Sequence, residues 1–282
     1  MLIVESICVL RFVIKHWHRK NQNVALVPTM GSIHEGHLSL VAAARKHADI
    51  VIVSIFINPM QFDKNEDFYI YPRSLEEDYI KLKKNNVDLV FSPSISSIYP
   101  EGISNHTYVE VPKYSRILEG VNRPKHFRGV TTLISKLFNF IKPNIAYFGE
   151  KDFQQVFIVK KLVVDMGYDI NIISVPTLRT KDGLALSSRN KYLTTEEKKL
   201  AIMLNKTINI MATQLKERKW CIEKIISEGE ILLKKCGFKI DILTICHPIS
   251  LDILKEHDDC AVIIAAAWLG KTRLIDNKTL YL

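Results

Sequence analysis

Short apolar segments alternate with helix-length segments over the first two thirds of this 282-residue chain. Runs rich in Val and Ile, such as Ile50–Ile57 and Val87–Phe91, are separated by segments in which apolar residues recur with a helical period. A strand, a crossover helix and a second strand form a unit, and repeated units build a parallel sheet covered by helices on both faces. The alternation therefore predicts an α/β fold.

The expected elements are identified by the spacing of their apolar residues and by signals at their ends. Ser74 stands three residues before Glu77, which is the pattern of a capping box, and Pro143 ends a helical period that starts near Arg128. Strands are expected over 24–27, 50–57, 87–91, 145–148 and 170–175, and helices over 36–47, 74–86, 128–142 and 152–166.

The pattern changes after Pro176, where we place a domain boundary. Thr194 and Glu197 form a second capping-box pattern at the start of a long helical segment. Helices are expected over 195–218 and 220–235, and strands over 240–246 and 260–269. We therefore expect an N-terminal domain over 1–176 and a smaller α+β domain over 177–282, the latter acting as a lid.

The net charge of +9 is spread along the chain. Residues 1–176 hold 21 basic and 17 acidic side chains, and residues 177–282 hold 18 and 13. Diffuse charge suits a solvated surface and an anionic small substrate at least as well as a nucleic acid. Five cysteines without a C-x-x-C pair argue against a disulfide framework and a cysteine zinc site. They indicate a reducing, cytoplasmic environment.

Neither a membrane span nor a secretory signal is expected. The apolar run Ala261–Leu269 is far shorter than the roughly 20 residues that a spanning helix needs. The first segment of the chain is apolar before it is basic, which is the reverse of a secretory signal. We interpret it as the beginning of the fold.

A turn rich in glycine and histidine, Pro28-Thr-Met-Gly-Ser-Ile-His-Glu-Gly-His37, joins the first expected strand to the first helix. Gly31 and Gly36 allow the backbone to approach a ligand, and the helix start offers N–H groups to phosphate. His34 and His37 can donate hydrogen bonds to a phosphate whose charge grows as pyrophosphate leaves. The alternatives are a zinc pair, which would need further ligands, and a plain glycine turn.

Two further strand ends carry polar side chains. Asn58 and Gln61 follow one strand, although Asn-Pro alone also favours an ordinary turn. After another strand, Gly149 leaves room, Lys151 offers a charge to phosphate, and Gln155 can face the same pocket. Asp152 in that segment could equally cap the following helix.

A loop past the boundary, Asp182-Gly-Leu-Ala-Leu-Ser-Ser-Arg-Asn190, brings two hydroxyls and a guanidinium together. Arg189 can bind phosphate through two parallel hydrogen bonds. The alternative is an ordinary polar loop. Earlier in the chain, Tyr71–Asp78 ends in carboxylates, which suit Mg²⁺ or a solvated helix face equally well. The segment His126–Val130 reads equally well as a substrate contact or as a helix start.

The H-x-G-H turn after the first strand resembles the nucleotidylyltransferase superfamily, to which class I aminoacyl-tRNA synthetases also belong. The longer string Pro-Thr-Met-Gly-x-x-His-x-Gly-His is similar to the pantothenate synthetase family, whose members are pantoate–β-alanine ligases. The motifs Asn-Pro-x-Gln-Phe, Gly-Glu-Lys-Asp-x-x-Gln and Ser-Ser-Arg-Asn follow in the same order. The resemblance runs from about Val24 to Asn190 and resumes at 266–270 and 273–277.

The resemblance implies a Rossmann-like N-terminal domain, a homodimer, and ATP-dependent ligation of pantoate to β-alanine with release of AMP and diphosphate. The reaction would pass through a pantoyl adenylate. Mg²⁺ would accompany ATP, with Asp78 as its ligand because Glu77 already has a capping role. The implied catalytic residues are His34, His37, Lys151 and Arg189.

The same resemblance implies the binding residues. Pantoate contacts fall on Met30, Gln61 and Gln155, and β-alanine is assigned to Gln61. ATP contacts fall on Met30, Gly31, Ser32, Ile33, His34, Glu35, Gly36, His37, Gly149, Glu150, Lys151, Asp152, Leu178, Leu186, Ser187, Ser188 and Arg189.

Two other functions remain open from the residues. One is a different H-x-G-H nucleotidylyltransferase that acts on a phosphate substrate, which would not need two glutamines around an acid pocket. The other is an RNA-binding module related to the tRNA synthetases, which would need a tRNA-binding appendage. We expect small-molecule substrates, no nucleic acid partner and no membrane partner.

Overall fold

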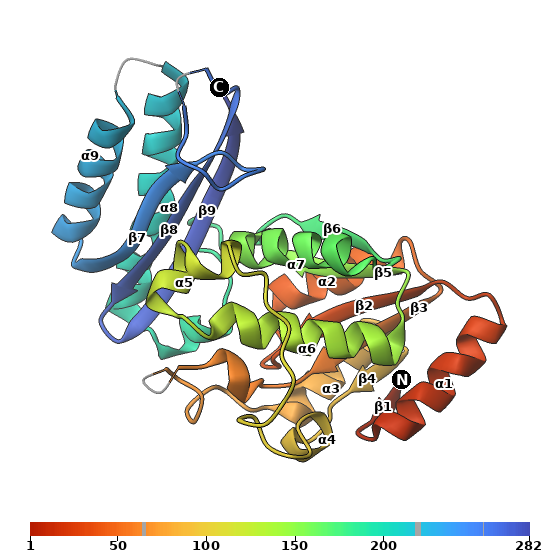
Figure 1. The fold of residues 1–282 in the computed structure, drawn as a ribbon. Helices are drawn as coiled ribbons and strands as arrows, with labels where there is room; N and C mark the ends of the chain where they lie inside the picture. Colours follow the sequence, from red (N-terminus) through yellow and green to blue (C-terminus); the bar gives the residue numbers. More distant parts are fainter. Residues whose placement is uncertain (64–65, 218–220, 256) are drawn as a thin grey trace. The chain divides into compact units, whose positions relative to one another are not determined.

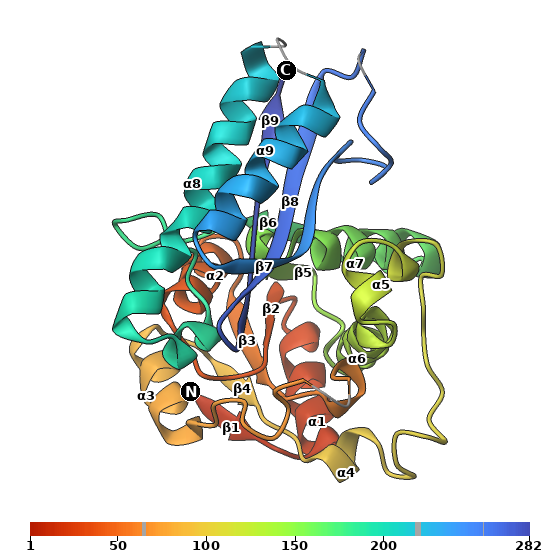
Figure 2. The same ribbon diagram turned by 90° about the vertical axis from the view of Figure 1, so that its left-hand side faces the viewer.

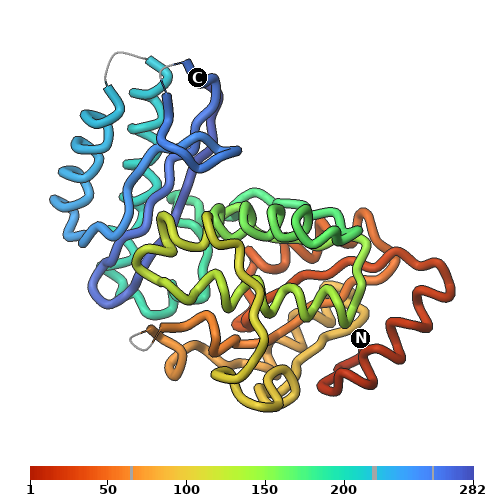
Figure 3. Tube along the Cα trace, in the orientation of Figure 1, coloured from red at the N-terminus to blue at the C-terminus, as the bar shows by residue number. Residues whose placement is uncertain are grey.

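The computed structural model describes residues 1–63, 66–217, 221–255 and 257–282, whose trace is drawn in Figure 3. These residues separate into two compact units. Unit 1 is Met1–Glu150 with Gln154–Pro176, and unit 2 is Lys151–Phe153 with Thr177–Leu282. The expected helix ends at residues 218 and 220 lie outside the described residues.

Unit 1 is built on a six-stranded sheet in which every pairing is parallel. The strand order is β1-β4-β3-β2-β5-β6, so the expected parallel α/β sheet is confirmed (Figure 1). The order reverses between β2 and β5, and such a switch point opens a crevice at the carboxyl ends of the two strands. The strands are β1 (Leu2–Val4), β2 (Val24–Thr29), β3 (Ile50–Ile55), β4 (Leu89–Phe91), β5 (Ile145–Gly149) and β6 (Asn171–Val175).

Helices cover both faces of this sheet, because right-handed crossovers that run in opposite directions along the sheet place their helices on opposite faces. The longer ones are α1 (Ile7–Arg19), α2 (Glu35–Arg45), α3 (Leu75–Lys84), α6 (His126–Ile141) and α7 (Phe153–Met166). Short turns of helix are α4 (Ile95–Ile98), α5 (Glu119–Asn122), η1 (Pro59–Gln61), η2 (Tyr114–Arg116) and η3 (Glu150–Asp152). Apolar side chains of α1, α6 and α7 fill one side of the sheet, and those of α2 and α3 fill the other.

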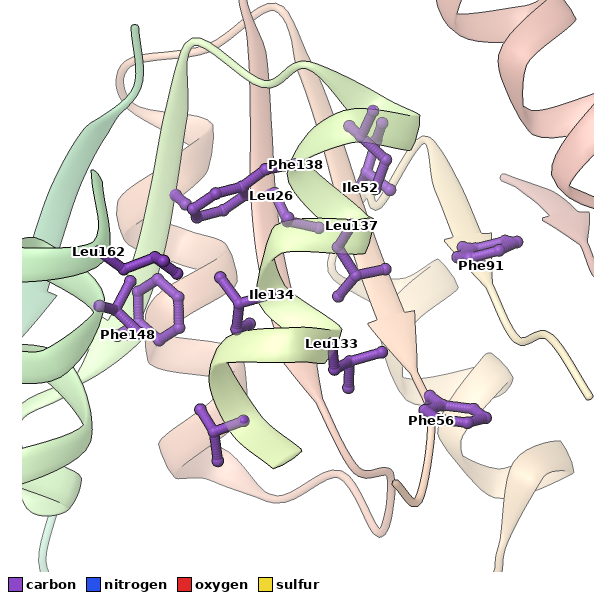
Figure 4. Packing of buried hydrophobic residues seen from close by; sticks show 14 of the residues in the cluster. Leu26, Ile52, Phe56, Phe91, Leu133, Ile134, Leu137, Phe138, Phe148 and Leu162 are labelled. Atoms are coloured by element: carbon purple, nitrogen blue, oxygen red, sulfur yellow. The ribbon is translucent and has the colours of Figure 1, made fainter. Parts of the chain in front are cut away.

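Strand β2 shows how the two apolar layers arise. Successive side chains of a strand point to opposite faces, so Val24 and Leu26 join one layer while Ala25 and Val27 join the other. Figure 4 shows Leu137 of α6 in the same layer as Leu26. Because both faces are dry, Val24–Val27 of β2 is a continuous apolar run, and the histidine turn leaves the sheet where this strand ends.

Unit 2 is a three-stranded antiparallel sheet with two helices, seen from a second side in Figure 2. The strands are β7 (Phe238–Cys246), β8 (Cys260–Leu269) and β9 (Thr272–Tyr281), and the helices are α8 (Thr195–Glu217) and α9 (Ile222–Lys235). Apolar residues of both helices pack on β8 in one cluster. A short helix, η4 (Ser188–Tyr192), precedes α8.

The two expected capping boxes differ in outcome. At α8, Thr194 N donates to Glu197 Oε2 at 2.8 Å and Glu197 N donates to Thr194 Oγ1 at 3.1 Å, which confirms the box. At α3 the expectation is wrong, because Ser74 Oγ instead donates to Asp78 Oδ1 at 3.3 Å and Glu77 is exposed. The carboxylate one residue further on is buried and accepts the hydroxyl.

The first segment and the last residues of the chain, for which no elements were expected, are also regular structure. They form β1 with α1, and β9. Among the described residues, no helix combines the length and the apolar character that crossing a membrane requires.

Candidate active site

The polar segments expected to bind substrate in unit 1 leave the carboxyl ends of β2, β3 and β5. These strands are neighbours in the sheet, and β2 and β5 flank the switch point. Parallel strands present all their carboxyl ends at one edge, so the three segments share that edge. The position matches the place where ligands bind in open parallel sheets.

The turn after β2 is held by a buried carboxylate. Gly31 and Ser32 both have positive φ, at 83° and 51°, which turns two successive backbone N–H groups inward. Asp78 Oδ2 accepts the N–H of Ser32, and Asp78 Oδ1 accepts that of Ile33, each at 2.7 Å. A Cβ on Gly31 would lie 3.0 Å from Ile55 and 3.2 Å from Asp78, so the close approach requires glycine.

Asp78 does not fit the magnesium role expected for it. The side chain is 1% exposed, and both oxygens accept backbone N–H groups of the turn. Burial raises the pKa of the Asp78 carboxyl, and the N–H groups of Ile33 and Ser32 oppose that rise. The expectation rested on a capping role for Glu77 that the structure lacks. Asp78 is therefore a clamp for the turn between β2 and α2.

His34 and His37 start α2 as a reciprocal pair. His34 Nδ1 accepts the N–H of Gly36 at 3.1 Å, and His37 Nδ1 accepts the N–H of His34 at 3.4 Å. The two rings are stacked, with centroids 4.0 Å apart. Because each Nδ1 is an acceptor, the neutral rings carry their proton on Nε2. Each Nε2–H is then a donor beside a helix N-terminus, which is where an anion is favoured.

Asn58 and Gln61 form a connected amide pair beside Met30. Asn58 Nδ2 donates to Gln61 Oε1 at 3.2 Å, and Gln61 Nε2 donates to Met30 Sδ at 3.2 Å. Asn58 is 0% exposed and Gln61 is 8% exposed. The structure thus brings together Met30 and Gln61, two of the three residues expected to contact pantoate.

Helix α6 packs against this pair. A Cβ on Gly129 would lie 2.5 Å from Gln61 N and from the carbonyl carbon of Met60, so only glycine lets the helix lie against η1. His126 Nδ1 donates to the Gln61 carbonyl at 2.9 Å. The backbone that Gly129 admits is therefore that of η1, and Val130 is buried in the apolar layer, so the contacts favour the helix start over the substrate contact for His126–Val130.

The segment after β5 contains two adjacent glutamines that differ in burial and in hydrogen bonding. Gln154 is 1% exposed, accepts from Glu119 N and donates to the carbonyls of Tyr114 and Ile117. Gln155 is half-buried. A Cβ on Gly149 would meet nothing within 4 Å, so the packing of the protein does not itself require glycine there. These facts favour Gln155 over Gln154 as a substrate contact.

The serine-rich loop of unit 2 begins as a narrow hairpin. Leu186 N donates to the Leu178 carbonyl at 2.9 Å, which places these two expected ATP contacts side by side. Ser187 Oγ accepts the N–H of Arg189 at 3.3 Å and caps η4. Ser188 is buried, while Ser187 and Arg189 are half-buried. Five of the expected ATP contacts thus lie on this hairpin and the turn that follows it: Leu178, Leu186, Ser187, Ser188 and Arg189.

An ion pair ties the hairpin to β9. Arg179 donates to both oxygens of Asp276, at 2.6 and 2.7 Å, and also to the Gly183 carbonyl at 3.2 Å. Asp276 is 3% exposed and also accepts from Asn205 Nδ2 at 3.2 Å. The next residue, Asn277, donates through Nδ2 to the Lys151 carbonyl at 2.9 Å. One strand thus anchors both the hairpin and the backbone of an expected phosphate-binding lysine.

Four residues that shape these sites have roles that their sequence positions did not indicate: Asp78, which clamps the turn, Tyr99, whose hydroxyl donates to Asn58 Oδ1 at 2.7 Å, Arg179 and Asp276. Asp78 was expected to have another role. Its spacing of four residues from the apolar Leu82 could have indicated that it lies on the buried face of α3. Arg179 and Asp276 are oppositely charged residues beside the motifs, but 97 positions separate them, so only the fold pairs them. No group of three or more potential metal-ligating His, Cys, Asp or Glu side chains occurs in the part of the chain described here.

Comparisons with known proteins agree over the whole chain. A family model described as Pantoate-beta-alanine ligase matches residues 2–279. The crystal structure of a pantothenate synthetase from Thermus thermophilus is 39% identical, with a TM-score of 0.93 and full coverage of both chains. A pantoate-beta-alanine ligase from Francisella tularensis, solved in complex with Beta-gamma ATP and Beta-alanine, is 36% identical with a TM-score of 0.80. That match covers 99% of this chain and 97% of the other.

Proposed function

The chain belongs to the pantoate-beta-alanine ligase family. We propose that the clamped histidine turn binds ATP and that the Asn58–Gln61 pair serves pantoate binding in the first step of the reaction. The activity of the chain is the ATP-dependent joining of pantoate to β-alanine. The observation that carries the residue assignment is the reciprocal pair of His34 and His37, which orients two ring donors at a helix start.

The reaction needs ATP because a carboxylate oxygen is a poor leaving group. The pantoate carboxylate attacks the α-phosphorus of ATP, the bond to the bridging oxygen breaks, and diphosphate leaves with its electron pair. The product is pantoyl adenylate. The amine of β-alanine then attacks the acyl carbon, AMP leaves, and the amine loses a proton. Positioning and charge stabilisation suffice for the first step.

In this proposal His34 and His37 donate from Nε2 to the phosphates as negative charge moves toward diphosphate. Their tautomer supports this, since Nδ1 of each ring is engaged by the backbone. The turn residues from Met30 to His37 line the nucleotide, and Asp78 fixes their backbone through Ser32 and Ile33. A fixed donor requires no reorganisation at the moment of reaction.

Pantoate contacts are assigned to Met30, Gln61 and Gln155. Gln61 directs its Nε2 toward the Met30 sulfur, which is a weak acceptor, so the amide retains a strong interaction for a substrate oxygen. The burial of Gln61 increases the value of that hydrogen bond. Gln61 would also contact β-alanine when it attacks the adenylate.

Unit 2 is proposed to supply the remaining cations and hydroxyls. Ser187, Ser188 and Arg189, with the Leu178–Leu186 hairpin, would close on the ATP phosphates as a lid. Lys151 would contribute a point charge, with Gly149, Glu150 and Asp152 around it. The short hairpin and its ion pair to β9 support a loop of defined shape that can serve this purpose.

Three further assignments follow the family. Mg²⁺ would enter with ATP. A magnesium ion bound to phosphates commonly needs only one or two protein carboxylates, and Asp78 would not be among them. A homodimer is proposed from the resemblance. All five cysteines are free, which supports a reducing, cytoplasmic compartment.

Exchange of labelled diphosphate into ATP tests this function directly. The purified protein should catalyse the exchange with pantoate alone, and should form AMP and pantothenate only when β-alanine is added. Added RNA should change neither rate. Exchange that requires a phosphorylated substrate in place of pantoate would instead identify another nucleotidylyltransferase, and dependence on RNA would identify a synthetase-related module.

A further inference from the structure

A buried tyrosine reaches the pantoate side of the site through one amide. Tyr99 follows α4 and its hydroxyl donates to Asn58 Oδ1 at 2.7 Å. Asn58 in turn donates from Nδ2 to Gln61 Oε1 at 3.2 Å. Tyr99 and Gln61 are 38 positions apart in the chain and are linked by this single side chain.

The orientation of the Asn58 amide is determined on both sides. Oδ1 accepts two donors, the Tyr99 hydroxyl and the Met60 N–H at 3.2 Å. Nδ2 serves two acceptors, Gln61 Oε1 and the Gly129 carbonyl at 2.9 Å. A flipped amide would set oxygen against oxygen and N–H against N–H at a position that is 0% exposed. Asn58 therefore has one orientation.

The orientation of Gln61 follows from that of Asn58. Its Oε1 is occupied by Asn58 Nδ2, so its Nε2 is the end directed toward Met30 and the substrate side. A glutamine amide offers a donor at one end and an acceptor at the other. Here the end presented is the donor.

Tyr99 is built to keep its hydroxyl in place. The side chain is 2% exposed, and its ring contacts Phe56 at 6.2 Å and the edge of His106 at 5.0 Å between centroids. The Lys136 ammonium lies 5.5 Å from the ring centroid. Burial raises the pKa of the Tyr99 phenol, so the hydroxyl remains a donor across the working pH range.

We propose that Tyr99 is a positioning residue that fixes Gln61 as a hydrogen-bond donor toward pantoate. The site would thereby select a substrate with an oxygen acceptor, such as a carboxylate, at that point. This inference rests on the proposed pantoate contact of Gln61. Tyr99 touches no substrate and acts only through Asn58.

The test compares Tyr99→Phe with Tyr147→Phe. Tyr147 is the matched control, because it is 0% exposed and its hydroxyl also has one partner, His47 Nδ1 at 3.0 Å, in the other apolar layer. Loss of one buried hydrogen bond predicts a rise in the KM for pantoate of about tenfold in Tyr99→Phe. The KM for ATP should stay within about twofold, and Tyr147→Phe should change neither constant.

A cycle with Gln61→Ala distinguishes this inference from the proposed function. Gln61→Ala alone should raise the KM for pantoate, and adding Tyr99→Phe to it should raise that KM no further. If Gln61→Ala leaves pantoate binding unchanged, the assigned role of Gln61 is wrong. If Gln61→Ala weakens pantoate binding but Tyr99→Phe behaves like Tyr147→Phe, the role of Tyr99 is overturned.

A second variant covers the case in which Tyr99→Phe does not fold. Asn58→Asp keeps the acceptor for Tyr99 and removes the donor that orients Gln61. It should raise the KM for pantoate selectively. An equal rise in the KM values for pantoate and ATP would show general disorder of the site and would contradict the proposal.

Discussion

The imidazole rings of His34 and His37 stack with their centroids 4.0 Å apart at an interplanar angle of 30°. Each ring accepts a backbone N–H from within the same turn, so the helix cap and the proposed phosphate donors are the same two side chains. A helix start normally satisfies its N–H groups with Ser, Thr, Asp or Asn. Histidine in this place adds a second nitrogen that can act on a ligand.

The two tasks of His34 can be separated by mutation. Asn is a good N-cap residue, so His34→Asn should retain the melting temperature of the protein. The variant lacks the Nε2–H donor, and loss of one such donor costs on the order of 100–1000-fold in rate. Diphosphate–ATP exchange and thermal melting check this together, with His37→Ala expected to lose activity to a similar extent. Normal exchange by either variant would remove that histidine from the mechanism.

The sequence predicted the parallel sheet well because both of its faces are buried. Runs such as Ile50–Val53 are apolar throughout, and a parallel sheet covered by helices on both faces buries them. Local signals failed where tertiary contacts compete. Ser74 had an available partner in Glu77, but the fold brings the Asp78 carboxylate into its reach. Long-range pairs such as Arg179 with Asp276 leave no local pattern, because neither partner changes the periodicity of its own segment.

If Asp78 holds the turn and does not bind Mg²⁺, its replacement should lower the stability of the protein even when no metal is present. Asp78→Asn replaces an acceptor oxygen with an N–H group that faces a backbone donor, which costs about 1–3 kcal/mol for each unsatisfied group. Urea unfolding without nucleotide or metal should show this loss. The exposed residue Asp165 provides the control, and Asp165→Asn should change the free energy of unfolding by less than about 0.5 kcal/mol. Unchanged stability with a higher requirement for Mg²⁺ would restore Asp78 as a metal ligand.

The ion pair between Arg179 and Asp276 should be worth more than surface pairs of the same type. Its carboxylate is 2% exposed and bound at both oxygens, so removal of one partner leaves a buried charge. Arg179→Ala leaves this buried carboxylate without its cation and should destabilise the protein by about 3–5 kcal/mol. Lys234→Ala breaks the exposed pair with Glu230 and should cost at most about 1 kcal/mol. Chemical denaturation measures both, and equal losses would show that the hairpin is not anchored through Arg179.

Lys151 and Arg189 are expected to act while diphosphate departs. Both are proposed to hold the triphosphate, and negative charge builds on the bridging oxygen as diphosphate departs. Their contacts should therefore be stronger in the first transition state than with bound ATP. Arg189→Lys should be poorly tolerated, since an ammonium cannot reproduce the planar fork of a guanidinium. The variant should lower kcat for diphosphate release more than it raises the KM for ATP.

The second half-reaction provides the internal control. When pantoyl adenylate is supplied directly, diphosphate is already absent, so attack by β-alanine should be slowed much less in Arg189→Lys and in Lys151→Ala. Rapid-quench measurement of the two half-reactions on the same preparations makes the comparison independent of the fraction of folded protein. If both half-reactions slow by the same factor, these cations position the adenylate itself, and their assignment to diphosphate departure is wrong. The comparison therefore shows whether Lys151 and Arg189 act on the departing diphosphate or on the bound adenylate.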